Sequence, residues 1–286
     1  MNKKCLFLQM KYQKQRNDMD SVADWIEAKP PRGKYTFTRK EVVEAFPRMK
    51  PEVISTTLSR EVKKGRIMIP QQGFYVIIPE EYKLRGVVPQ AFYIDDLMRY
   101  LGRRYYVALL SAGSYHGAAH QVPMTFCVMT EPPTMRDKKT KKYATRFFYR
   151  QEIPMEYVEQ RQTRTGSVNV SCPELTAIDL VTYQERAGSI TRAATVLAEL
   201  VEKTDFGRLG PEFMKVAPVA CFQRLGYILE EVLEEQEAAD ALYELMKRAG
   251  VRLQRAALKA GKEISGAELN SRWKILVNEQ IEIDEL

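Results

Sequence analysis

The 286 residues contain only two histidines and four cysteines, the side chains that most often bind zinc and other transition metals. The cysteines (Cys5, Cys127, Cys172 and Cys221) are scattered and form no CxxC pair, which argues against a zinc ribbon or a disulfide scaffold. A membrane span would need about 20 mostly apolar residues in a row, and no such run is present. The first residues contain too short an apolar segment for a secretory signal. We therefore expect a reduced, cytoplasmic chain with no membrane contact.

The sequence also lacks the short motifs that mark common active sites. It has no glycine-rich phosphate loop, no nucleophile elbow and no Cys-His motif, so we predict no catalytic residue and no cofactor. Glu174 and Asp179 offer a pair of carboxylates for acid–base chemistry. They follow Pro173, however, in a pattern typical of the start of a helix, and we interpret them as structural.

The two histidines, His116 and His120, are four residues apart and could share one face of a helix. A metal site would need a further ligand, for which Cys127 and Glu131 are the nearest candidates in sequence. Gly117 indicates that the helix ends in this segment. We favour histidines that are hydrogen-bonded inside the body of the protein, and no metal.

Charge is unevenly distributed along the chain. Residues 1–85 contain 18 Lys/Arg against 10 Asp/Glu, residues 86–220 contain 17 against 14, and residues 221–286 contain 9 against 13. A basic beginning joined to a nearly neutral body is the asymmetry expected when one end of a protein meets a polyanion. Solubility alone is the alternative explanation.

The first eighty residues predict three helices and a hairpin. Ser21 can cap the first helix, and Thr38 with Glu41 forms a capping box at the second. A short strand precedes this box. A third helix is predicted over residues 51–64, because it has proline in its first turn and Gly65 at its end.

The segments that follow this third helix read as a β-hairpin. Apolar residues at 66–69 and 74–79 flank a polar turn that is closed by Gly73. Three helices followed by a hairpin are typical of a winged helix-turn-helix domain. Such domains bind DNA, but they also dock proteins or dimerise.

The 51–64 helix has an apolar stripe, formed by Val53 or Ile54 with Leu58 and Val62, and a polar face. That face carries hydroxyls and cations without a bulky apolar group, which suits the major groove. Residues predicted to face bases or adjacent phosphates are Ser55, Thr56, Ser59 and Arg60. Residues predicted to bind phosphates or to lie at the wing tip are Lys50, Lys63, Lys64, Arg66, Gln71 and Gln72.

The rest of the chain predicts a mixed α/β body followed by helices. We expect strands at 125–130, 147–150 and 166–171, and a continuous apolar helix over 105–112. A basic loop at 136–142 is either a solvated hairpin tip or a second contact to nucleic acid or a partner. After residue 189, apolar residues recur at helical spacing. These apolar faces fit core packing or, alternatively, a partner-binding groove.

Three segments of this body resemble the AbiEi family of antitoxins. They are RYYVALLSA at 104–112, YHGAAHQVP at 115–123 and CPELTAIDLV at 172–181, and the resemblance extends over residues 20–235. It implies a type IV toxin–antitoxin protein that represses its own operon through the winged helix. It also implies antagonism of a co-encoded nucleotidyltransferase-like toxin, without the need for a stable complex.

The sequence thus predicts an α+β protein with three parts. These are a winged helix-turn-helix domain at 1–85, an α/β antitoxin domain at 86–235 and a helical extension at 236–286. The expected partners are operator double-stranded DNA and the toxin, and repeats in the operator would fit a dimer on DNA. The alternative is an RNA-contacting or nucleotide-processing enzyme body fused to a winged-helix targeting module.

Overall fold

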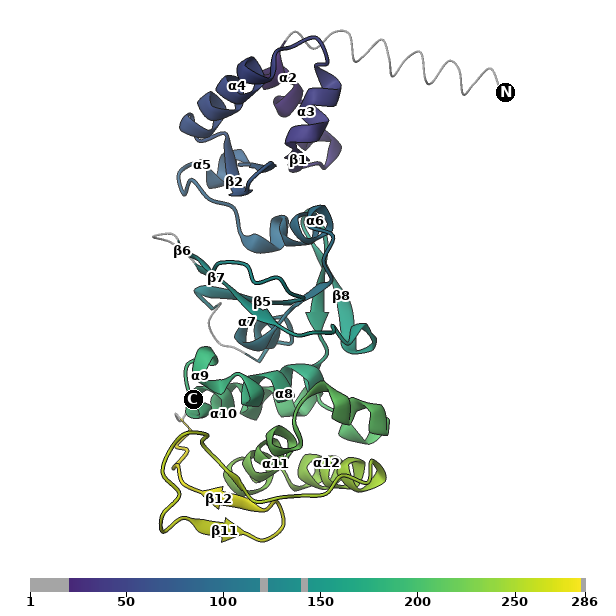
Figure 1. Ribbon diagram of the computed structural model, residues 1–286, viewed down its shortest axis with the longest axis vertical. Helices are drawn as coiled ribbons and strands as arrows, with labels where there is room; N and C mark the ends of the chain where they lie inside the picture. Colours follow the sequence, from purple (N-terminus) through teal and green to yellow (C-terminus); the bar gives the residue numbers. More distant parts are fainter. Residues whose placement is uncertain (1–20, 119–122, 140–143, 284–286) are drawn as a thin grey trace, which may run out of the picture. The chain divides into compact units, whose positions relative to one another are not determined.

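The computed structural model describes residues 21–118, 123–139 and 144–283, which form a mixed α+β structure with three separate sheets (Figure 1). Two compact units divide the chain. Unit 1 contains the residues up to Arg103 together with residues 162–168, and unit 2 contains the remainder. Residue 85, where the sequence suggested a domain boundary, therefore lies inside unit 1. Within the described ranges, none of the helices is both long and apolar enough for a bilayer crossing.

Unit 1 begins with a helix, a strand, two helices and two strands. They are α2 (Val22–Glu27), β1 (Thr36–Thr38), α3 (Arg39–Ala45), α4 (Pro51–Lys63), β2 (Ile67–Gln71) and β3 (Phe74–Ile77). The strands form an antiparallel sheet in the order β1-β3-β2. The predicted helices, short strand and hairpin are confirmed.

Local hydrogen bonds explain where these helices begin. The Ser21 hydroxyl accepts a hydrogen bond from the backbone N–H of Asp24 at 3.2 Å. Thr38 accepts from the N–H of Glu41 at 3.2 Å, and the Glu41 carboxylate accepts from the N–H of Thr38 at 2.6 Å. The capping box is therefore present, and it satisfies two backbone donors that the first turn of a helix leaves without partners.

The apolar faces of these elements enclose one small core. Phe37 of β1 and Tyr75 of β3 stack with their ring centroids 5.1 Å apart. Two further helices, α5 (Glu80–Lys83) and α6 (Ile94–Tyr100), follow the hairpin in unit 1. The core residues are Val22, Ile26, Phe37, Val42, Ile54, Leu58, Ile67, Tyr75 and Ile77. Each fully buried aliphatic or aromatic side chain stabilises such a core by about 1.5–3 kcal/mol.

Unit 2 is built on a six-stranded sheet in the order β6-β7-β5-β4-β9-β8. The strands are β4 (Tyr105–Val107), β5 (Thr125–Thr130), β6 (Lys138–Lys139), β7 (Ala144–Tyr149), β8 (Val158–Thr163) and β9 (Gly166–Ser171). β4 pairs in parallel with β9 and antiparallel with β5. The pairing of β6 with β7 brackets the basic loop, whose residues 140–142 lie outside the described residues.

The prediction of a continuous helix over residues 105–112 is wrong. Residues 105–107 form the central strand β4, and the helix α7 (Leu109–Tyr115) starts only afterwards. Tyr-Tyr-Val is a strongly β-prone run, and its residues are buried between β5 and β9. Leu109, with φ +54°, lies in the left-handed region and turns the chain from strand to helix. A short apolar run buried on all sides carries no periodicity that could distinguish these two outcomes.

Helices pack next to this sheet in unit 2, where Figure 1 shows α8 and α10 adjacent to each other and α11 and α12 beyond them. They are α8 (Pro173–Thr182), α9 (Gln184–Ala187), α10 (Ile190–Leu200), α11 (Val219–Tyr227) and α12 (Gln236–Arg248). α10 and α12 turn one apolar face inward, whereas residues 173–181 of α8 are all buried. α8 is therefore the central helix of unit 2.

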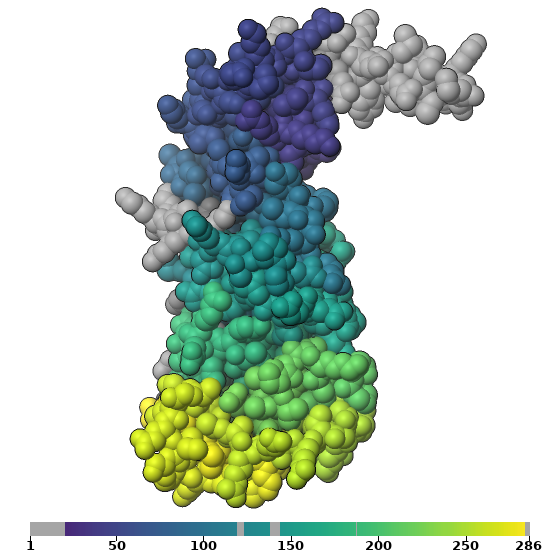
Figure 2. Space-filling view, viewed as in Figure 1, coloured from purple at the N-terminus to yellow at the C-terminus, as the bar shows by residue number. Residues whose placement is uncertain are grey.

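From residue 249 to residue 283 the chain contains no further helix, which corrects the expectation of a helical extension over 236–286. A small sheet in the order β10-β12-β11 forms from β10 (Ala256–Ala257), β11 (Glu268–Asn270) and β12 (Ile275–Val277). In the space-filling view its yellow atoms lie directly against the green helices (Figure 2). Trp273 is fully buried there, and a Cβ on Gly226 of α11 would come within 2.1 Å of its ring. Glycine at 226 thus permits the close approach of this segment.

Candidate functional site

Helix α4 presents one face to the core of unit 1 and the other to solvent. Ile54, Leu58 and Glu61 are buried, whereas Val53 is 47% exposed. The stripe therefore runs through Ile54 and not through Val53. The hairpin β2–β3 follows directly, with its turn at Gly73 in the left-handed region at φ +78°. Glycine occupies this conformation without steric strain.

Most of the residues predicted to meet DNA lie on the solvent side. The fully exposed ones are Lys50, Thr56, Ser59, Arg60, Lys63, Lys64 and Gln72, and the half-buried ones are Ser55, Arg66 and Gln71. Exposure makes these side chains available to a ligand. Their hydrogen bonds and ion pairs, however, divide them into distinct groups.

The hydroxyls of α4 bind its own backbone. Ser55 donates to the carbonyl oxygen of Pro51 and Thr56 to that of Glu52, each at 2.8 Å. Such bonds to the preceding turn are usual for hydroxyl side chains within helices. They fix the rotamers and leave the oxygen lone pairs of Thr56 directed outward as acceptors.

Two of the predicted phosphate-binding cations are already paired. Glu61 is only 3% exposed, and its carboxylate accepts from Lys64 Nζ at 2.8 Å and from Arg66 Nη1 at 3.3 Å. Arg66 also pairs with Glu27 of α2 at 2.8 Å. We did not predict this buried carboxylate, although its position seven residues after Ile54 and three after Leu58 places it on the apolar stripe.

Arg60 and Lys63 differ from these two. Both are exposed, and neither forms an ion pair with any residue in the described ranges. They lie in the last turns of α4, where positive charge is favoured by the helix dipole. Their charge is thus not neutralised within the molecule, which makes them the strongest anion-binding groups of the helix.

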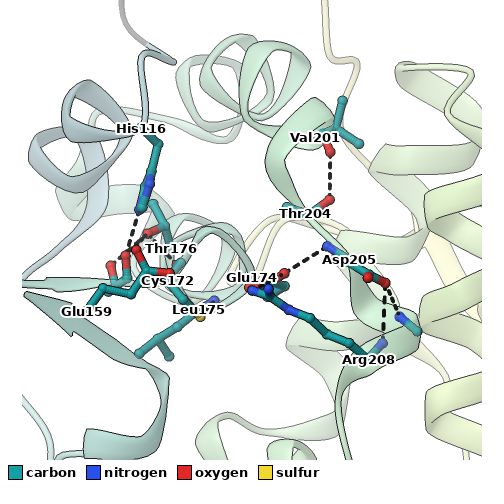
Figure 3. Close-up of polar contacts among 12 residues, drawn as sticks. His116, Glu159, Cys172, Glu174, Leu175, Thr176, Val201, Thr204, Asp205 and Arg208 are labelled. Carbon is teal, nitrogen blue, oxygen red and sulfur yellow. Dashed lines mark hydrogen bonds and ion pairs between the residues drawn. The ribbon is translucent and has the colours of Figure 1, made fainter.

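A second group of polar residues surrounds α8 in unit 2. Glu174, in the first turn, has no exposed surface; it accepts from the backbone N–H of Asp205 at 2.7 Å and from Arg208 at 3.0 Å (Figure 3). Asp205 in turn accepts from the N–H groups of Gly207 and Arg208. The cluster therefore ties the start of α8 to the segment that follows α10.

His116 lies at the end of α7 and contacts the residue just before the Cys172 cap of α8 (Figure 3). Its Nε2 donates to the carbonyl oxygen of Ser171 at 2.7 Å, and its Nδ1 faces Arg161 at 3.5 Å. Burial, together with the Arg161 charge, lowers the pKa of His116 in spite of the Ser171 bond. The imidazole is therefore neutral near pH 7 and acts as a structural donor, while His120 lies outside the described residues.

Asp179, farther along α8, is also completely buried. Its carboxylate accepts from the Tyr106 hydroxyl at 2.8 Å and pairs with Arg150, which is 9% exposed. Burial raises the pKa of Tyr106, and the Asp179 charge adds to this effect, so the phenol remains protonated. Asp179 and Glu174 thus serve separate networks and do not act as one pair.

The Cys127 and Cys172 thiols of unit 2 are poor nucleophiles. Burial raises the pKa of Cys172 to about 12, with the Glu174 charge adding to the effect, and burial raises the pKa of Cys127 to about 11. Thiolates are therefore scarce at neutral pH. Across the described ranges no three His, Cys, Asp or Glu side chains gather as a metal site would require.

Comparison with known families assigns this second region. Residues 106–231 match the family model of the AbiEi antitoxin C-terminal domain. The resemblance to the AbiEi antitoxins drawn from the sequence is confirmed over these residues. The Glu174 and Asp179 networks both lie within the matched segment.

Solved structures give a further likeness. The chain is similar to the crystal structure of the Rv2827c protein from Mycobacterium tuberculosis, with a TM-score of 0.63 over 89% of this chain and 90% of that chain. The two sequences are 12% identical, so the similarity is one of fold. No curated protein sequence matches the chain.

Proposed function

We propose that this chain is a transcriptional repressor and antitoxin that regulates its own toxin–antitoxin operon. Unit 1 would bind operator DNA, and the AbiEi domain would antagonise a co-encoded nucleotidyltransferase-like toxin. The first activity is supported by the geometry of α4 and the hairpin. The second is supported by the family match over residues 106–231.

The element order of unit 1 is typical of a winged helix-turn-helix domain, in which α4 would be the recognition helix and β2–β3 the wing. α4 would lie in the major groove with its solvent face against the bases. Repression would be steric, through groove occupancy and phosphate neutralisation, and would need no cofactor. Two copies of the chain would occupy repeated half-sites.

The observation that carries this proposal is the unpaired positive charge on the exposed face of α4. Arg60 and Lys63 have no carboxylate partner among the described residues, in contrast to Lys64 and Arg66. Exposed cations next to small hydroxyls, on a helix with a free solvent face, match the chemistry of a phosphate-lined groove. A protein-docking helix would instead be expected to expose several apolar anchors, whereas Val53 is the one large apolar side chain that α4 exposes.

The test of DNA binding is a gel shift with the full chain and the DNA upstream of its own operon. We expect Arg60→Ala and Lys63→Ala each to weaken binding about tenfold, since each removes a charged contact of about 1.4 kcal/mol. Lys215→Ala is the matched control, because Lys215 is an exposed cation of unit 2. Wild-type affinity in both α4 variants would remove this helix from the proposed role.

The antitoxin role needs a separate test. Co-expression of the full chain with the neighbouring toxin gene should restore growth that the toxin alone arrests. The Arg60→Ala/Lys63→Ala double variant should still restore growth, because the AbiEi domain is unchanged. Failure of the wild-type chain to protect would contradict toxin antagonism and leave DNA binding to be judged by the gel shift.

A further inference from the structure

Unit 1 contains a cavity of about 520 Å³ between the wing and the start of α3. Arg39, Tyr75 and Tyr100 line it, together with the wing residues 71–73. No carboxylate is part of this lining. The cavity adjoins α4 as well, because Arg39 Nη2 donates to the Ser55 hydroxyl at 2.8 Å.

Arg39 is a half-buried cation that forms no ion pair within the described ranges. Its hydrogen bonds to Ser55 and, at 3.5 Å, to the carbonyl oxygen of Pro51 both use Nη2. The remaining guanidinium N–H groups are available toward the cavity. A partly desolvated cation without a counter-ion is costly, and an anion at this position would offset that cost.

Tyr75 provides a second polar group on the cavity wall. Its side chain is 6% exposed, and its hydroxyl makes no hydrogen bond with a described residue. The hydroxyl is open to the cavity, because within the described ranges Arg150 Nε is the one fully buried side-chain polar atom without a partner. Stacking of the ring on Phe37 holds the hydroxyl in this position, where it could donate to a ligand.

The wing wall of the cavity is held in place by α6. Tyr100 donates to the carbonyl oxygen of Gln72 at 3.2 Å, and a Cβ on Gly73 would come within 2.7 Å of the same hydroxyl. The close contact between the wing turn and Tyr100 is therefore possible only because residue 73 is glycine. The backbone N–H of Arg39 donates to the carbonyl oxygen of Gly73 at 2.8 Å, which ties the same turn to the start of α3.

We infer that this cavity is a phosphate site that holds one backbone phosphate of the operator, with Arg39 and Tyr75 as donors. The inference rests on the proposed function, since the cavity lies beside the wing, and Arg39 in its wall contacts Pro51 and Ser55 of α4, the other part that would meet DNA. Phosphate contacts that flank a recognition helix fix its register in the groove. The Arg39 guanidinium would contact both the phosphate and, through Ser55, the recognition helix.

The experiment measures operator affinity of the full chain by fluorescence anisotropy over a series of salt concentrations. Arg39→Gln should weaken binding about tenfold. It should also reduce the slope of log affinity against log salt by about 0.9, the value for one phosphate contact. Tyr75→Phe should weaken binding about threefold at an unchanged slope, because it removes one neutral donor.

Arg39→Lys distinguishes a direct phosphate contact from a role in positioning α4, because lysine keeps the positive charge but loses the forked guanidinium that bridges to Ser55. We expect it to retain the wild-type slope. If Arg39→Gln and Arg39→Lys lose affinity equally, both with the wild-type slope, Arg39 only positions α4 and the inference is wrong. Thermal melts of each variant exclude loss of folding as the cause.

Two further outcomes are distinguishable. Inorganic phosphate that binds the DNA-free protein, combined with an Arg39→Gln variant of unchanged operator affinity, would assign the cavity to a small free anion and overturn the inference. A wild-type chain that binds no operator at low salt would overturn the proposed function together with it. Wild-type binding with no effect of Arg39→Gln contradicts the phosphate site alone.

Discussion

Helices α4 and α8 begin alike and use their polar residues in opposite ways. Each has proline in its first turn and several hydroxyl or charged side chains. In α8 the polar residues are buried and bonded within unit 2, whereas α4 exposes Arg60 and Lys63 without ion pairs among described residues. Residue type alone therefore does not mark a binding surface. The fold decides which of these charges are paired and which are left at the surface.

The largest effect should come from breaking the buried network of α8. Asp179→Ala leaves Arg150 buried without its carboxylate, and we expect the free energy of unfolding to fall by about 3–5 kcal/mol in urea titration. Tyr106→Phe removes only one hydrogen bond and should cost about 1 kcal/mol. A loss below 1 kcal/mol for Asp179→Ala would show that this network is not essential for stability.

A smaller effect is expected at Glu61 of α4, whose carboxylate is buried and ion-paired like the carboxylates of α8. Glu61→Gln should lower the free energy of unfolding by about 1–2 kcal/mol, since its basic partners remain half-exposed and regain water. It should also strengthen operator binding at low salt, because Lys64 and Arg66 lose their counter-charge. Weaker binding by a folded variant would mean that Glu61 mainly orients these cations.

The dependence of stability on pH offers a finer comparison. The pKa of His116 is lowered in the folded protein from its ordinary value of 6.5, so the unfolded chain binds more protons as the pH falls through this range. Stability from this group is complete above pH 6.5 and decreases below it. In His116→Gln, the denaturation midpoint should change less between pH 7 and pH 5 than it does in the wild-type chain. An identical pH profile for the variant would contradict a neutral, buried imidazole.

The smallest effect on stability should come from the exposed face of α4. Arg60→Ala and Lys63→Ala should each change the free energy of unfolding by less than about 0.5 kcal/mol, as substitutions away from packed or bonded positions do. Thermal and urea denaturation of the same preparations used in binding assays measure this. A loss above 1 kcal/mol in either variant would mean that the side chain is part of the fold.

Local signals allowed most of unit 1 to be predicted. The capping box at Thr38, the proline at 51 and the glycine at 73 act within a few residues, so they can be recognised without knowledge of the fold. The burial of Glu61 could have been recognised from its position on the apolar stripe, since its partners Lys64 and Arg66 lie within five residues. The surroundings of Arg39 could not be recognised, because the hairpin turn at 71–73 is distant from it in sequence.

Unit 2 was predicted less completely. Strands 125–130 and 166–171 are confirmed, the first as a continuous β-prone run and the second through its alternating Val168 and Val170, and the start of α8 is confirmed at Pro173. The strand at 105–107 was missed because burial on both sides removes periodicity. Strands β10 and β11 of the C-terminal sheet were missed because they are only two and three residues long and lie in a segment held by the packing of Trp273 against Gly226.

The most direct test of the central claim compares the salt dependence of operator binding between the wild-type chain and the Arg60→Ala/Lys63→Ala double variant. If the unpaired cations of α4 bind phosphates, the double variant should reduce the slope of log affinity against log salt by about 2. Its urea denaturation curve should match that of the wild type. An unchanged slope in a fully folded double variant would show that α4 does not face DNA.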